Sequence, residues 1–154
     1  MKKLNQKLII EQMDKKMAFF KKVIQIEPPA KGWIQAIRVA LKMSLRQFGE
    51  RMNITSPSVR ELEQREALGT ISLKSMREAA QALDMKFVYG FVPKEESLAV
   101  MVDKQALRVA RKIVMRTDNT MKLEDQRVSK ERVEKAVREL ADEIKREMPR
   151  YLWD

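Results

Sequence analysis

The side chains best placed for chemistry lie on the second of two adjacent helices predicted between residues 45 and 64. This helix presents Ser56, Pro57, Arg60 and Glu61 outward. The guanidinium of Arg60 can donate paired hydrogen bonds, the carboxylate of Glu61 can only accept them, and Pro57 has no backbone N–H to donate. This face therefore predicts recognition of a polar partner, because it holds no nucleophile beside a base.

The elements that must position this face have the layout of a helix-turn-helix. Ser44 and Thr55 are N-cap residues for helices at 45–52 and 56–64, and Pro57 suits a first helical turn. The crossing of the two helices needs a small residue, which Gly49 supplies, and the corner needs a residue that tolerates positive φ, which is Asn53. Apolar residues must hold the angle between the helices, and these are Phe48, Met52, Ile54, Val59 and Leu62.

Composition excludes several classes of function. The 154 residues include no Cys and no His, which excludes disulfides, Cys/His zinc sites and Ser–His or Cys–His catalytic pairs. There is no Walker loop and no clustered carboxylate motif for a metal, so we expect neither an enzyme nor a cofactor. Only four Gly and five Pro favour a mostly α fold.

Positive charge is concentrated near the N-terminus. The net charge is +10, and residues 1–42 hold ten basic and three acidic side chains, a net of +7. Apolar residues from Leu4 to Ile24 recur at helical spacing until Pro28-Pro29 stops the helix. We expect this helix to pack on the rest of the protein, and contact with phosphates or an anionic membrane surface are the alternatives.

Helical patterns continue along the chain. Short helices fill residues 34–83, and longer ones are expected at 95–116 and, after the N-cap Ser129, at 130–148. The patterns divide the chain into a basic amphipathic arm at 1–30, a DNA-binding domain of helix-turn-helix type at 31–84, and a C-terminal region at 85–154 for dimerisation or partner binding.

One segment has the pattern of a β-strand. In residues 85–92, Phe87, Tyr89 and Phe91 stand at every second position and would share one face of a strand, and Pro93 ends the run. A lone strand leaves its backbone groups unpaired, so the partner strand is expected from another chain, either a second copy or a different protein.

No segment is expected to enter a membrane. The longest relevant apolar run, residues 98–102, is far shorter than a spanning helix, and the Met1-Lys-Lys start lacks the apolar core of a signal peptide. The expected location is the cytoplasm.

Residues 34–83 resemble the phage-repressor-like, xenobiotic-response-element family of helix-turn-helix proteins, with its five-helix pattern. In that family the second helix of the motif enters the major groove of DNA. The resemblance implies that Ser56, Pro57, Arg60 and Glu61 face base edges. It also implies that five polar residues lie near phosphates: Ser44, Gln47, Thr55, Ser58 and Gln64.

Three residues depart from the family pattern. Leu45 stands where the family commonly has a Gln that bonds a phosphate, Asn53 replaces the usual Gly, and Pro57 cannot donate a hydrogen bond. Base readout would therefore depend mainly on Arg60, which suits guanine O6 and N7, with Glu61 toward cytosine N4.

A closer resemblance covers nearly the whole chain. Five segments are similar to segments of the bacterial family called mobile mystery protein A: Gly32-Trp-Ile-Gln-Ala-Ile-Arg38, Gly69-Thr-Ile-Ser-Leu73, Val88-Tyr89 through Val92-Pro93, Thr120-Met-Lys-Leu-Glu-Asp-Gln126 and Leu152-Trp153. Its members are regulators encoded beside mobile mystery protein B, which contains a Fic domain. The resemblance implies an antitoxin that neutralises a Fic-domain toxin and represses its own operon.

A short pattern also resembles the inhibitory motif of Fic-domain regulators, Ser/Thr-x-x-x-Glu-Gly/Asn. Thr120 and Glu124 match the first two landmarks, and Asp125 departs from the third. An alternative interpretation is that Glu124 only pairs with a neighbouring Lys or Arg.

The leading hypothesis is a homodimeric repressor that binds double-stranded DNA with two-fold half-sites. The alternative is a protein-binding antitoxin or adaptor without specific DNA readout. Its contacts would come from Phe87, Tyr89, Phe91, Thr120 and Glu124.

Overall fold

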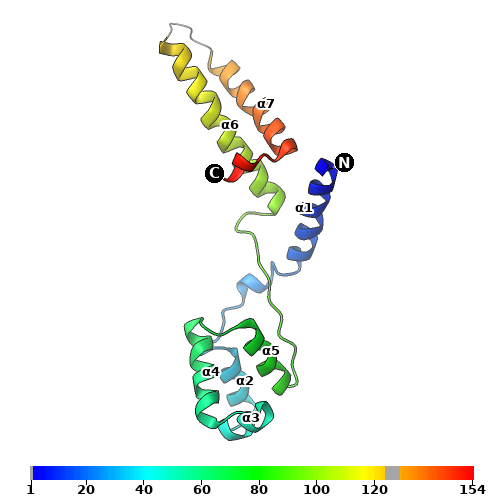
Figure 1. Ribbon diagram of the computed structural model, residues 1–154, viewed down its shortest axis with the longest axis vertical. Helices are drawn as coiled ribbons and strands as arrows, with labels where there is room; N and C mark the ends of the chain where they lie inside the picture. Colours follow the sequence, from blue (N-terminus) through cyan, green and yellow to red (C-terminus); the bar gives the residue numbers. More distant parts are fainter. Residues whose placement is uncertain (1, 124–128) are drawn as a thin grey trace. The chain divides into compact units, whose positions relative to one another are not determined.

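The computed structural model describes residues 2–123 and 129–154, and these residues are mostly helical (Figure 1). This confirms the mostly α fold class. The α-helices are α1 Lys2–Ala18, α2 Trp33–Ala40, α3 Leu45–Met52, α4 Ser56–Leu68, α5 Leu73–Ala82, α6 Leu98–Leu123 and α7 Lys130–Glu147, and the 3-10 helices are η1 Val23–Gln25 and η2 Arg150–Trp153. Among the described residues, no helix combines the length and the apolar character needed to cross a membrane.

The chain divides into two compact units. We call Lys22–Gly90 the central unit, and Met1–Lys21 together with Phe91–Asp154 the terminal unit. The sequence patterns place boundaries after residues 30 and 84 and treat the first helix as a separate arm. In the structure, α1 instead belongs to the same unit as α6 and α7.

A carboxylate on α1 explains this grouping. Asp14 accepts hydrogen bonds from the backbone N–H groups of Leu98 (2.7 Å) and Ala99 (3.2 Å) at the start of α6. These N–H groups have no partner within the helix, and a negative charge there also interacts favourably with the helix dipole. Ile10, one turn earlier on α1, packs against the core of the terminal unit. Together these contacts attach α1 to α6.

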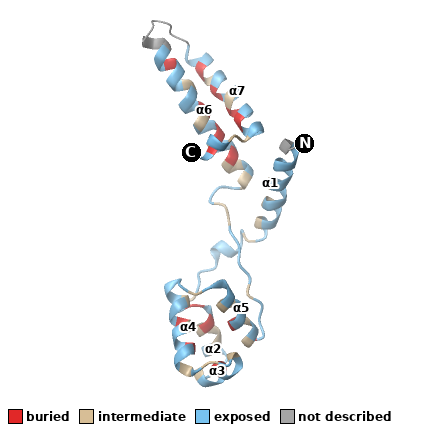
Figure 2. Ribbon diagram, in the orientation of Figure 1, coloured by how far each residue is buried: buried red, intermediate tan, exposed pale blue. Residues whose placement is uncertain are grey.

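The apolar stripe expected on the first helix is not the face that packs. Leu4 is 68% exposed and Ile9 is 44% exposed, and Figure 2 shows α1 as mainly exposed. The helix also ends at Ala18, whereas the sequence pattern extends it to Ile24. Residues 19–26 are rich in aromatic and β-branched side chains, which lose rotamer freedom in a helix, and only the short η1 forms there.

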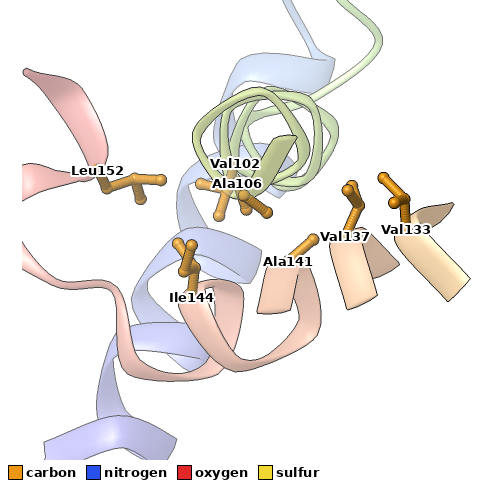
Figure 3. Packing of buried hydrophobic residues seen from close by; sticks show 8 residues of the cluster. Val102, Ala106, Val133, Val137, Ala141, Ile144 and Leu152 are labelled. Carbon is orange, nitrogen blue, oxygen red and sulfur yellow. The ribbon is translucent and has the colours of Figure 1, made fainter. Parts of the chain in front are cut away.

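The core of the terminal unit lies between α6 and α7, which run antiparallel to each other (Figure 1). On α7, the helical spacing of positions 133, 137, 140, 144 and 148 predicts one apolar stripe, and this is confirmed: Val133, Val137 and Ile144 are buried, and Leu140 and Met148 pack beside them. On α6 the buried apolar positions are one turn apart. The buried residues, most of them labelled in Figure 3, are Val102, Ala106, Ala110, Val133, Val137, Ala141, Ile144 and Leu152.

The central unit, all of which is described, contains four α-helices, α2 to α5, and not the five expected from the resemblance. After Leu83, Asp84 has a left-handed backbone (φ 55°), which ends the helical run, and the alternating aromatic residues that follow do not suit a helix. The buried core of this unit consists of Ile34, Phe48, Val59, Ala79 and Leu83.

The strand expected at residues 85–92 is not formed in the single chain. These residues are described, and they have neither helical nor strand structure. The physical reason is that a strand needs a neighbour to complete its hydrogen bonds, and no described segment pairs with residues 85–92. Pairing with another chain remains a prediction.

Candidate nucleic-acid interface

The corner between α3 and α4 is held by local caps. The Ser44 hydroxyl accepts a hydrogen bond from the Gln47 backbone N–H (3.1 Å), and the Gln47 side-chain carbonyl accepts one from the Ser44 N–H (2.8 Å). Asn53 ends α3 in the left-handed conformation (φ 55°, ψ 41°). Thr55 then caps α4 by accepting from the Ser58 N–H (3.3 Å). The sequence predicts the roles of Ser44, Asn53 and Thr55, and the structure confirms them.

The crossing of the two helices depends on Gly49. A Cβ atom added there would lie 2.6 Å from the backbone oxygen of Ile54 and 3.3 Å from Cγ2 of Val59. The first distance is too short for any side chain, and a backbone atom cannot easily move away. The expected need for a small residue at this position is therefore confirmed.

A nearly buried ion pair joins α4 to α2. The side chains of Arg38 and Glu63 are 11% and 6% exposed, and two guanidinium nitrogens of Arg38 donate to the carboxylate. A third guanidinium hydrogen bond goes to the Met43 backbone oxygen (2.9 Å). A buried charge needs such partners, because removing one would leave the other without compensation.

A second carboxylate on α4 caps the N-terminus of α2. Glu66 accepts hydrogen bonds from the backbone N–H groups of Trp33 (2.8 Å) and Ile34 (2.9 Å). The residue before them, Gly32, has a φ of 91°, and a Cβ there would lie 2.5 Å from Oε2 of Glu66. With the Arg38–Glu63 pair, this contact fixes α4 on α2 at two points one turn apart. Sequence reasoning does not identify either contact.

The outer face of α4 carries the residues expected to read bases. Pro57, Arg60 and Glu61 are exposed, and Ser56 is half-buried. Glu61 accepts a hydrogen bond from Arg65 one turn later, whereas Arg60 forms no ion pair within the part of the chain that the structure describes. Arg60 is thus the cationic donor free to bind a ligand, and Glu61 must first release Arg65.

The residues expected near phosphates lie mostly at the N-terminal ends of α3 and α4. All five are exposed: Ser44, Gln47, Thr55, Ser58 and Gln64. The hydroxyls of Thr55 and Ser58 bond each other (2.9 Å), which uses one of their two O–H donors. Gln47 keeps its amide NH₂ available, because only its carbonyl is used in the cap. These ends can therefore still donate hydrogen bonds to an anion.

A surface hollow of about 420 Å³ lies between α4 and α2. It places Arg60 and Gln64 beside Lys31 and Gln35, two polar residues that sequence reasoning does not single out. Lys31 comes just before the Gly32 turn, and only the packing of α2 on α4 brings it to this face. The full lining is Lys31, Gln35, Arg38, Leu45, Arg60, Glu63, Gln64 and Ala67.

The residues expected to bind a protein partner differ in their exposure and in the contacts that they make. The rings of Phe87 and Tyr89 stack with their centroids 5.9 Å apart, and Phe91 is 81% exposed. The Thr120 hydroxyl donates to the backbone oxygen of Arg116 within α6 (3.0 Å). Glu124 lies outside the described residues.

Comparison with protein-family models, curated proteins and solved structures finds no match for this chain. The function must therefore be inferred from the residues and their geometry, together with the resemblance in the sequence.

Proposed function

We propose that the protein is a dimeric, sequence-specific DNA-binding repressor whose helix α4 lies in the major groove. The observation that carries the proposal is a rigidly held helix with an unpaired guanidinium on its outer face. Glu63 and Glu66 attach α4 to α2, and Arg60, one turn before Glu63, lies exposed at the edge of that contact. Precise placement matters here, because base recognition requires a side chain held in fixed register with the groove.

Arg60 would provide most of the base readout. Its guanidinium can donate two parallel hydrogen bonds to O6 and N7 of guanine. No other base offers this pair of acceptors in the major groove. Ser56 and Pro57 would contact neighbouring base edges, and Glu61 would reach cytosine N4 only after its bond to Arg65 opens.

Phosphate contacts would come from the N-termini of α3 and α4. Both ends carry a partial positive charge from the helix dipole, and their Ser and Thr caps keep donor capacity. Lys31 and the N-terminal lysines would add salt-dependent attraction to the DNA backbone.

The family resemblance extends this proposal to an operon. It implies that the repressor regulates its own operon and acts as the antitoxin of a Fic-domain protein. A dimer would bind half-sites about one helical turn apart.

Substitution of Arg60 tests the proposal on DNA from upstream of the gene. Arg60→Ala should weaken binding to the preferred duplex by roughly 1–3 kcal/mol and relax the preference at one base pair. Lys21→Ala should weaken all sequences alike and reduce the salt dependence. Arg138→Ala, on an exposed site of α7, is the matched control and should change neither. Unaltered binding by Arg60→Ala would mean that α4 is not the recognition helix.

The second candidate function is a protein-binding antitoxin or adaptor without specific DNA readout. It is favoured by the exposure of Tyr89 and Phe91, 54% and 81%, beside a backbone that lacks a partner strand. Co-purification with the product of a neighbouring gene, in a protein that shows no preference between duplexes, would support it.

A further inference from the structure

Residues 86–96 have an unpaired backbone, which bends only at residues 94–96. Within this fully described range, no backbone N–H or C=O takes part in a backbone–backbone hydrogen bond. No residue from Met85 to Ser97 has a positive φ. The Phe87 and Tyr89 rings stack nearly parallel, at 17°, so two side chains two positions apart share one side, as they do along a strand.

One ring of this segment is already fixed in place by the central unit. The guanidinium of Arg77, on α5, lies 5.6 Å from the centroid of Tyr89. Two further apolar side chains of the segment are open, since Val88 is 67% exposed and Phe91 is 81% exposed. The segment thus combines a strand-like backbone without a ladder partner and large apolar side chains without cover.

We infer that residues 86–92 pair with the same residues of a second copy of this chain, as a two-stranded antiparallel ribbon centred on Tyr89. In such a two-fold pair, positions equally far before and after the centre face each other. Phe87 then faces Phe91 of the second copy, and Tyr89 faces its own counterpart. Cross-strand aromatic pairs of this kind stabilise antiparallel strands.

Charges and Pro93 select this register among the two-fold possibilities. Centred on Tyr89, Lys94 comes opposite Asp84 of the second copy, whose exposed carboxylate also contacts Arg51 of its own chain (3.6 Å). A ribbon centred on Gly90 would place Lys86 opposite Lys94, two like charges. One centred on Val88 would place Pro93 opposite Leu83, which is buried in the core of the central unit.

This self-complementarity favours a second copy as the occupant over a different protein. Each chain supplies both halves of every pair, so the aromatic face and the opposite charges are satisfied by one symmetric contact. The inference deepens the proposed function, since that function requires a dimer, and it names the surface through which the dimer forms.

Single-cysteine cross-linking tests the register directly, because these 154 residues include no cysteine. Tyr89→Cys should form a disulfide-linked dimer under mild oxidation, because facing Cα atoms in a ribbon lie about 4.5–5.5 Å apart, within the range of a disulfide. Phe87→Cys and Phe91→Cys should each stay monomeric on a denaturing gel when oxidised alone and should cross-link when mixed. Like residues at these positions would be about 14 Å apart. Ala136→Cys, exposed on α7, is the control for random collision.

Two results would overturn the inference. One is a protein that is dimeric by light scattering but whose Tyr89→Cys variant cross-links no better than Ala136→Cys. The other is equal cross-linking of Phe87→Cys with itself, which would indicate another register. Circular dichroism of each variant shows that the helices are retained. The test uses no DNA, so cross-linking without specific DNA binding would reject the repressor alone, and specific binding by a dimer without this cross-link would reject the ribbon alone.

Discussion

The α3–α4 pair and the segment 86–96 differ in how far a single chain satisfies them. In α3–α4, the helix starts are capped, the crossing contains a glycine that only just fits, and both charges of the Arg38–Glu63 pair are compensated. In the segment, the backbone is unpaired and Phe91 is exposed. If the proposed function holds, α4 is already fixed in place before DNA binds, whereas the segment gains its hydrogen-bond partner only when a second chain pairs with it.

The largest expected effect comes from breaking the buried ion pair. Glu63→Ala should lower the free energy of unfolding by about 3–5 kcal/mol, because Arg38 would stay buried without a counter-charge. Urea unfolding followed by circular dichroism measures this. The double variant Arg38→Met/Glu63→Leu should recover most of the loss, and a single variant as stable as wild type would show that the pair does not hold α4.

Gly49→Ala should destabilise the central unit by about 1–3 kcal/mol, since its methyl group would meet the Ile54 backbone oxygen. The same urea titration gives the value. At an exposed helical position, replacing glycine with alanine stabilises a protein. A more stable Gly49→Ala variant would therefore contradict the close crossing.

Asp14→Ala should cost about 1 kcal/mol in the terminal unit, because two N–H groups of α6 lose their acceptor. Thermal unfolding of this variant beside Glu11→Ala, an exposed carboxylate on the same helix, isolates the cap. Equal stability of the two variants would mean that the cap contributes nothing.

Tyr89→Ala should have the smallest effect on unfolding, less than about 0.5 kcal/mol for dilute single chains, because the ring is half exposed. It should nevertheless raise the dimer dissociation constant at least about tenfold, the equivalent of 1.4 kcal/mol. Sedimentation equilibrium measures the proportions of monomer and dimer. A Tyr89→Ala variant that unfolds readily but still dimerises would mean that Tyr89 stabilises the single chain and not the dimer.

The parts of the fold that follow from sequence are those set by neighbours in the chain. Ser44, Thr55, Ser72 and Ser129 each cap the helix that starts after them, because a cap needs only the next few residues. Helical spacing likewise predicts the buried stripe of α7.

The parts that do not follow join residues far apart in the chain. Glu66 binds Trp33 across 33 positions, and Asp14 binds Leu98 across 84. An exposed-looking Asp or Glu has no periodic signal that distinguishes such a cap from a solvated charge. For the same reason the sequence predicts Arg60 and Gln64 at the candidate interface but does not bring Lys31 beside them.

The most direct test of the central proposal is fluorescence anisotropy of the purified protein on DNA from upstream of its own gene. A scrambled duplex runs beside it, each at two salt concentrations. A specific repressor should prefer the native duplex on the order of a thousandfold. Equal and steeply salt-dependent binding to both would contradict the proposal, because charge alone would then account for the affinity.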